Sequence, residues 1–161
     1  MKKLTNLEIA FTDSGLVDFT FFSSLNNLNY LGLFGELFSS INYCNVSALK
    51  ELSHLSEIRI HEFNFLDLTD FPALPSLERF SCLFGQTLIG IESVSKLCGL
   101  KALELCDIPV DSLNFLIPLD RSIHLDLCAL SVKDKIDYDL LNSFPHREVN
   151  EMQENCNRTN N

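Results

Sequence analysis

The nine residues LCGLKALEL at positions 97–105 decide the fold, because their form, LxxLxxLxL, recurs along the chain. The closing apolar pairs of the six copies begin at positions 7, 31, 58, 80, 103 and 125, at spacings of 24, 27, 22, 23 and 22 residues. Self-similarity at such a period is typical of a solenoid, in which every repeat forms one structural unit.

The segments between these pairs repeat as well. Apolar residues recur there at every third position, as at Leu88, Ile91, Val94 and Leu97. This spacing suits a 3-10 or short helical path, whereas the LxL pair suits a strand whose two apolar side chains point to one side. Each unit therefore has one apolar side, and stacking the units predicts a continuous core beside a parallel sheet.

The pattern resembles the leucine-rich repeat family over about residues 4–130, most closely the 22-residue class of SDS22-like proteins and bacterial internalins. The resemblance implies an α/β leucine-rich repeat solenoid with short parallel strands, 3-10 or short helical returns and six repeats. In one respect the chain departs from it. The family's turn asparagine is replaced at every expected position, which are Thr12, Glu36, Phe63, Gly85, Ile108 and Leu130.

The sequence of the C-terminal region predicts a cap for the last repeat. Ser131 can begin a helix as its N-cap, Val132, Ile136 and Leu140 would share one face, and Pro145 would end it. The expected organisation is a repeat domain over 1–147, with a cap helix at about 131–144. A polar, disordered tail is expected over 148–161.

The chain carries 22 acidic and 12 basic residues, which gives a formal charge of −10. Such a chain repels nucleic acid and anionic membranes and attracts a basic protein. It has no apolar run long enough for a membrane span or a secretory signal, so we expect a cytoplasmic protein. The six cysteines show no CxxC spacing and are expected to be reduced thiols.

The residues that flank the apolar positions of each strand should point outward, onto the face that is concave in leucine-rich repeats. We call this surface the concave face. Aromatic and arginine side chains dominate binding energy at protein interfaces, and this face carries both types. Alternatively, the insertion over residues 34–42 covers its aromatic residues. The predicted partner-binding residues are Tyr30, Phe34, Glu57, Arg59, His61, Arg79, Leu83, Glu104, His124 and Asp126.

Two groups of side chains have the residue types of a metal site or a catalytic site. Cys106 and Cys128 occupy the same position in adjacent repeats, with His124 nearby, but no fourth ligand completes a metal site. Cys128, Asp126 and His124 have the residue types of a nucleophilic triad. However, His124 and Cys128 are four residues apart on one strand, which separates them by roughly 13 Å and is too far. We therefore predict no enzyme activity, metal or cofactor.

The sequence thus predicts a protein-interaction module that binds a protein, expected to be basic, on the concave face. Two more specific roles remain open. One is an immunity- or antitoxin-type inhibitor of a toxin. The other is the substrate-recognition part of a larger bacterial effector enzyme.

Overall fold

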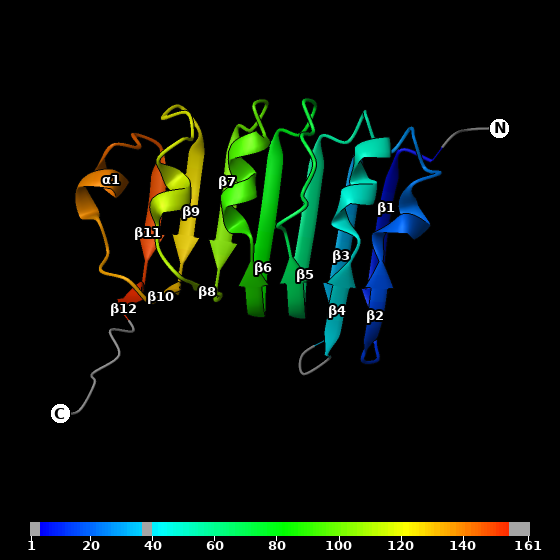
Figure 1. The fold of residues 1–161 in the computed structure, drawn as a ribbon, viewed down its shortest axis with the longest axis horizontal. Helices are drawn as coiled ribbons and strands as arrows, with labels where there is room; N and C mark the ends of the chain where they lie inside the picture. Colours follow the sequence, from blue (N-terminus) through cyan, green and yellow to red (C-terminus); the bar gives the residue numbers. More distant parts are fainter. Residues whose placement is uncertain (1–3, 37–39, 155–161) are drawn as a thin grey trace.

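The computed structural model describes residues 4–36 and 40–154, which form a solenoid whose longest wall is one parallel sheet (Figure 1). Each neighbouring pair in this wall is parallel and in register, so that Leu7, Leu31 and Ile58 align. The period-2 prediction is therefore confirmed. In spatial order its strands are β1 (Asn6–Phe11), β3 (Tyr30–Gly35), β5 (Glu57–Asp67), β6 (Arg79–Ile89), β7 (Ala102–Cys106), β9 (His124–Cys128) and β11 (Arg147–Asn150).

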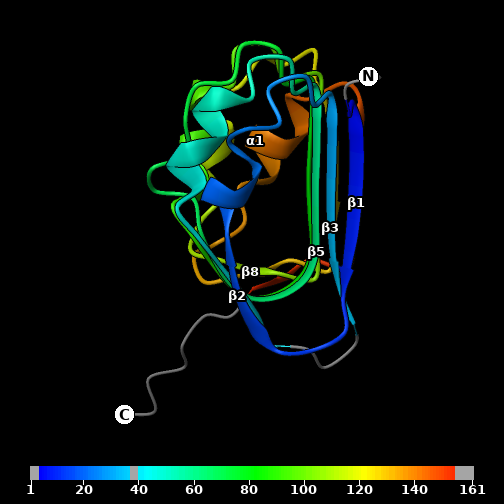
Figure 2. The same cartoon turned by 90° about the vertical axis from the view of Figure 1, so that its right-hand side faces the viewer.

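A second, shorter wall lies beyond the corner at which the chain turns away from the first wall (Figure 2). β2 pairs with β4, which pairs with the second half of β5, while β8, β10 and β12 form a small sheet of their own. β5 and β6 run through both walls without a break. The short strands of this wall are β2 (Gly15–Asp18), β4 (Ile41–Cys44), β8 (Pro109–Val110), β10 (Ser131–Val132) and β12 (Gln153–Glu154).

The chain returns through 3-10 turns on the side opposite the first wall (Figure 2), as the every-third-residue spacing predicts. These turns are η1 (Phe19–Phe22), η2 (Val46–Glu51), η3 (Ile91–Lys96) and η4 (Asn114–Leu116). Within the described ranges, no helix has the length and apolar character needed to cross a membrane.

The core lies between the walls and the returns. The paired apolar residues of the central strands, such as Leu103 and Leu105, are fully buried, as are Leu125 and Leu127 one strand further on. Burying each such side chain contributes about 1.5–3 kcal/mol. Glu104, between the first two, stays partly exposed, so the core and the outer surface alternate as the sequence predicts.

The missing asparagine is replaced by an apolar ladder at the corner between the walls. The residue directly before each position of this ladder forms the corner, and it has a left-handed backbone in five successive repeats, at Glu62, Phe84, Asp107, Ala129 and Glu151. Phe63, Ile108 and Leu130 follow such corners and are buried. Gly85 has no side chain there because a Cβ would lie 2.1 Å from the Phe63 ring.

Backbone bonds between neighbouring repeats replace the asparagine side chain at these corners. The N–H of Asp107 donates to the carbonyl of Cys128 at 2.9 Å, and that of Ala129 to the carbonyl of Asn150 at 2.8 Å. These bonds satisfy polar groups that the turn would otherwise leave unpaired.

The prediction that the cap helix begins at residue 131 is wrong. Ser131 and Val132 form β10, since the corner at Ala129 repeats the one 22 residues earlier. The helix is α1 (Tyr138–Asn142), and Asp137 caps it by accepting from the Leu140 N–H at 2.9 Å. The cap is therefore shorter than the apolar spacing indicates.

The predicted disordered tail is also wrong over residues 148–154, where a seventh repeat begins. β11 pairs with β9, which places Arg147 and Val149 in the positions of the strand leucines. Arg147 is tolerated there because the stack ends, and it donates to the Phe144 carbonyl at 2.9 Å and the Asn142 side chain at 2.7 Å. Residues 155–161 of the predicted tail lie outside the described residues.

Candidate functional site: the concave face

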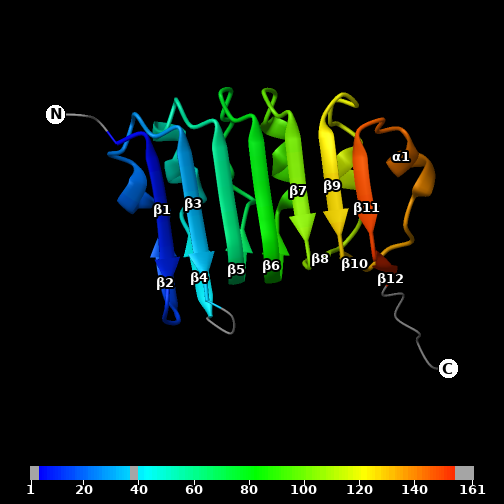
Figure 3. The same ribbon diagram turned by 180° about the vertical axis from the view of Figure 1, so that it is seen from behind.

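The strands of the first wall lie side by side (Figure 3), and the outward-facing positions along them form three rows that cross the wall. The strands hold them in register, so a residue lies opposite its counterpart in the next repeat. The upper row is Asn6, Tyr30, Glu57, Arg79, Ala102 and His124. The middle row is Glu8, Gly32, Arg59, Ser81, Glu104, Asp126 and Glu148. The lower row is Ala10, Phe34, His61, Leu83, Cys106, Cys128 and Asn150.

Two aromatic side chains meet over β3. A Cβ at Gly32 would lie 2.7 Å from both the Phe34 ring and the Tyr30 hydroxyl, so the glycine lets both lean over the sheet. The Tyr30 hydroxyl donates to Glu8 Oε1 at 2.8 Å. Burial and the Glu8 carboxylate together raise the pKa of Tyr30 to about 12, which keeps it a neutral donor.

A polar network continues from this aromatic pair into the centre of the face. The Phe34 ring packs edge-on against the His61 ring, with 5.0 Å between the two ring centroids. His61 Nε2 lies 3.3 Å from Ser81 Oγ, which in turn donates to Glu104 Oε2 at 2.9 Å. Burial lowers the pKa of His61, so a neutral ring is favoured.

The two arginines are placed differently. Arg59 Nε donates to Glu57 Oε1 at 2.6 Å, and its guanidinium lies 6.0 Å from the centroid of the Tyr30 ring. Both arginines line a hollow of about 180 Å³ together with Glu104 and Asp126, but Arg79 is exposed whereas Arg59 is half-buried.

Three carboxylates stand side by side at the C-terminal end of the middle row. Glu104 aligns with Asp126, and Asp126 aligns with Glu148 on β11. Burial, Glu104 and Glu148 raise the pKa of Asp126, in that order of size, while His124 partly opposes them. Like charges placed opposite one another destabilise a sheet, so the fold alone does not favour this arrangement.

Cys106 and Cys128 are neighbours in the lower row. They align in register at the ends of β7 and β9, and both are half-buried. Burial raises the pKa of Cys106 to about 12, with further contributions from Cys128 and the nearby carboxylates Asp107 and Asp126. In the described part of the chain, no group of three or more His, Cys, Asp and Glu side chains could hold a metal ion.

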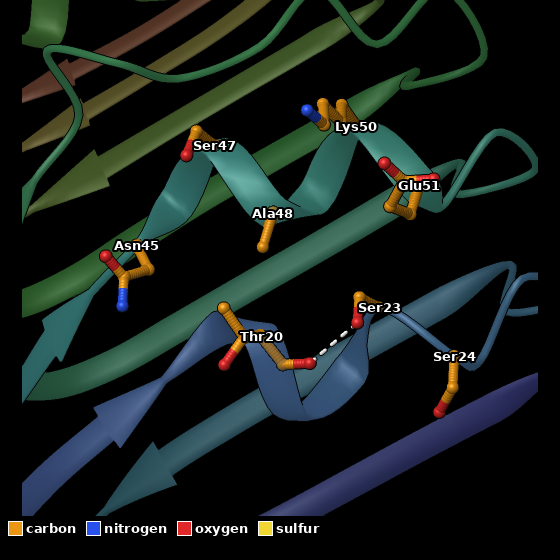
Figure 4. A pocket seen from close by; sticks show the side chains of 8 residues that line it. All are labelled: Thr20, Ser23, Ser24, Asn45, Ser47, Ala48, Lys50 and Glu51. Carbon is orange, nitrogen blue, oxygen red and sulfur yellow. Dashed lines mark hydrogen bonds between the residues drawn. The ribbon is translucent and has the colours of Figure 1, made fainter.

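A second hollow, of about 650 Å³, lies on the opposite side of the molecule between η1 and η2 (Figure 4). Small polar side chains dominate it, and the Ser23 hydroxyl is satisfied locally by donating to the Thr20 carbonyl at 2.7 Å. Figure 4 shows Lys50 and Glu51 at one end of it rather than converging on its centre. We regard it as a surface depression and not as a reactive site.

The structure places all ten predicted residues on the concave face, although their role in binding stays a prediction. The described contacts of Tyr30 and Phe34 include Glu8, Arg59 and His61, all on the concave face, so these aromatics pack on the face itself. Of the insertion, residues 37–39 lie outside the described residues.

The prediction missed three members of the site. The strand period also turns Glu8 and Ser81 onto this face, although neither is among the ten predicted residues, and Glu148 falls in the predicted tail. The signal for Glu148 was its distance of 22 residues from Asp126, the repeat length itself.

Comparisons with known proteins agree with this geometry at the level of fold. An internalin, InlF, from Listeria monocytogenes superimposes with a TM-score of 0.68 over 95% of this chain, at 17% sequence identity. The fold is an internalin-like leucine-rich repeat solenoid. Internalin C2 from the same species gives a TM-score of 0.60 over 93% of the chain, also at 17% identity.

This leucine-rich repeat chain spans 44% of the length of the InlF chain and 71% of that of internalin C2. No protein-family model and no curated protein sequence gives a significant match. The family resemblance is thus visible in three dimensions, where the repeat geometry is retained although few residues are identical.

Proposed function

We propose that this chain is a protein-interaction module that binds a basic segment of another protein across its concave face. The observation that carries the proposal is the row of Glu104, Asp126 and Glu148. Three aligned carboxylates are unfavourable in the free protein, and cations supplied by a partner would relieve their repulsion.

The neighbouring side chains support the same role. The aromatic pair of Tyr30 and Phe34 lies on the same face as the carboxylates, three strands before the first of them. Aromatic residues contribute most of the binding energy in many interfaces, whereas charges mainly speed association and select the partner. The face thus combines an apolar anchor with an acidic region.

The geometry fits a helix that crosses the strands. Neighbouring strands lie about 4.8 Å apart, and a helix advances 5.4 Å per turn. Lysine or arginine side chains at successive turns of one helical face would therefore meet successive carboxylates of the middle row.

The test compares three proteins as affinity baits. The wild type, a concave variant (Glu104→Gln, Asp126→Asn, Glu148→Gln) and a control variant (Glu51→Gln, Asp70→Asn, Glu92→Gln) are exposed to the same extract, and captured proteins are quantified by mass spectrometry. Both triple variants lose three negative charges, but the control residues are exposed and lie outside the concave face.

The proposal predicts a basic protein that wild type and control capture equally and the concave variant captures at least tenfold less. Equal capture by all three baits would contradict it. Equal loss from both variants would also contradict it, because net charge alone would then explain the binding.

One observation favours the second candidate, the recognition part of a larger bacterial effector enzyme. At the N-terminal end of the solenoid Leu4, Leu16 and Phe21 are 48%, 68% and 73% exposed. A packed domain or partner would cover these side chains. The inhibitor role, of immunity or antitoxin type, rests on the acidic row alone and requires that the captured protein be a basic enzyme whose activity the chain blocks.

A further inference from the structure

Two thiols of the concave face are placed to react with each other. Cys106 and Cys128 are in register on adjacent parallel strands, and their side chains project from the same face. Adjacent strands lie about 4.8 Å apart, and the Cα atoms of a disulfide lie about 4.4–6.8 Å apart. Both residues are half-buried, so a small reagent can reach the pair.

The other described cysteines lack such a neighbour. Cys44 aligns with Asp18, and Cys82 is fully buried between Ile60 and Leu105 in the sheet. Cys98 is exposed but lies in the turn before β7. The repeat geometry therefore singles out one pair.

We propose that Cys106 and Cys128 form a reversible dithiol–disulfide couple, oxidised by a low-molecular-weight disulfide. The thiolate of Cys128 attacks one sulfur of the reagent RSSR, and one RS⁻ leaves and takes up the proton that Cys128 has lost. The Cys106 sulfur then attacks the resulting mixed disulfide at Cys128. The protein disulfide forms, the second RS⁻ leaves, and it takes up the Cys106 proton. The dithiol loses two electrons, and RSSR gains them as two RSH.

The order of attack follows from the surroundings. Burial and neighbouring negative charge raise the pKa of the Cys106 thiol, which disfavours its thiolate, so we assign the first attack to Cys128. The carboxylates of Asp107 and Asp126 that act on Cys106 would also repel an anionic reagent such as glutathione disulfide. A cationic disulfide should react faster.

The bridge should also be easy to reduce. In a parallel pair, two side chains in register point the same way, so the Cβ separation stays near the strand spacing, whereas a disulfide needs about 3.8 Å. Closing the bond must draw together two strand ends that lead into the left-handed corners at Asp107 and Ala129. Strained disulfides are the labile ones. Any effect of the bridge on partner binding rests on the proposed function, but the bridge itself does not.

The experiment uses the full chain without a partner. Reduced, desalted protein is incubated with cystamine, free thiols are alkylated, and the chain is digested with trypsin. Cleavage at Lys101, Arg121 and Lys133 places Cys106 and Cys128 on separate peptides, 102–121 and 122–133, so a bridge links the two. The proposal predicts this linked pair as the main product at these cysteines, while Cys98 carries mixed disulfide.

Variants and reagents complete the test. Cys106→Ser should trap the mixed disulfide on Cys128, and Cys98→Ser should form the bridge as the wild type does. Glutathione disulfide should give the bridge at least several-fold more slowly than cystamine, and dithiothreitol should reverse it. Cys106 and Cys128 recovered unlinked after Cys98 has reacted fully would overturn the proposal, as would a bridge that forms only in denaturant. Either result would leave the proposed function untouched.

Discussion

Replacing Asp126 by Asn should stabilise the folded chain at neutral pH, although the change removes a charge from the candidate site. Asp126 has a carboxylate in register on each side, Glu104 on β7 and Glu148 on β11. Like charges directly opposite each other cost roughly 0.2–1 kcal/mol per pair. Two such pairs, partly offset by His124, give an expected gain of about 1 kcal/mol in the free energy of unfolding.

The gain should depend on pH in a defined direction. Folding raises the pKa of Asp126 above its ordinary value of 3.8. The contribution of this carboxyl to stability is therefore fully present below that value, and it is lost as the pH rises through the raised folded pKa. The difference between Asp126→Asn and wild type should be largest at pH 7, shrink towards pH 3.5, and fall as salt is added.

Urea unfolding followed by circular dichroism measures this difference, and a gain of 1 kcal/mol corresponds to about 2–4 °C in the melting temperature. Glu51→Gln, an exposed change at the end of η2, is the control of equal charge. An Asp126→Asn variant no more stable than wild type at pH 7, or a gain matched by the control, would refute the reasoning.

The other predictions concern the core, the turn before η3 and the kinetics of binding. Leu105→Ala should lower the free energy of unfolding in urea by roughly 2–5 kcal/mol, because it leaves a cavity in the core. Glu104→Ala should change that free energy by less than about 0.5 kcal/mol. Equal losses from both variants would mean that the predicted strand register is wrong. Gly90→Ala, at the turn before η3, should cost at least about 2 kcal/mol, because φ there is +71° and a Cβ would lie 2.3 Å from the Thr69 nitrogen. Gly15→Ala, in open space, is the neutral control, and similar melting temperatures for both variants would contradict the geometry of this turn. Once a partner is identified, surface plasmon resonance should show that Tyr30→Ala raises its dissociation rate and that Asp126→Lys mainly slows its association. Lys50→Ala, on η2, should alter neither rate. The reversed pattern would be evidence against an aromatic anchor combined with carboxylates that attract the partner.

The repeats could be predicted from the sequence because a strand and a 3-10 return impose different apolar periods. Leu103, Glu104 and Leu105 alternate as the period of two requires, and their neighbours align with them in register. The missing asparagine did not change this result, since Phe63, Ile108 and Leu130 bury the corner in its place. Apolar patterning thus determines the stack even where the turn chemistry differs.

The end of the solenoid could not be predicted by the same rule. A terminal repeat has a neighbour on one side only, so its core positions need not be apolar, and Arg147 occupies one of them. Val132 also fits a helical spacing with Ile136 and Leu140, although it belongs to β10. The repeat length, and not the apolar pattern, was the informative signal there.

The site could be predicted as a surface but not as a set of contacts. Strand alternation places Tyr30, Glu57 and Asp126 on one face. The hydrogen bond from Tyr30 to Glu8 and the one from Ser81 to Glu104 depend on side-chain conformations that spacing does not reveal. The row of Glu104, Asp126 and Glu148 could not be predicted, because it depends on the pairing of β11 with β9, which places Glu148 beside Asp126.

Carboxyl footprinting of the complex tests the central claim most directly. The chain, free and bound to the basic protein that it captures, is treated with a carbodiimide and glycine ethyl ester, and labelling of each carboxylate is read by mass spectrometry. The account predicts that the partner protects Glu104, Asp126 and Glu148 and leaves Glu51, Asp70 and Glu92 unchanged. Protection confined to residues outside the concave face, or unchanged labelling of its acidic row in a saturated complex, would contradict it.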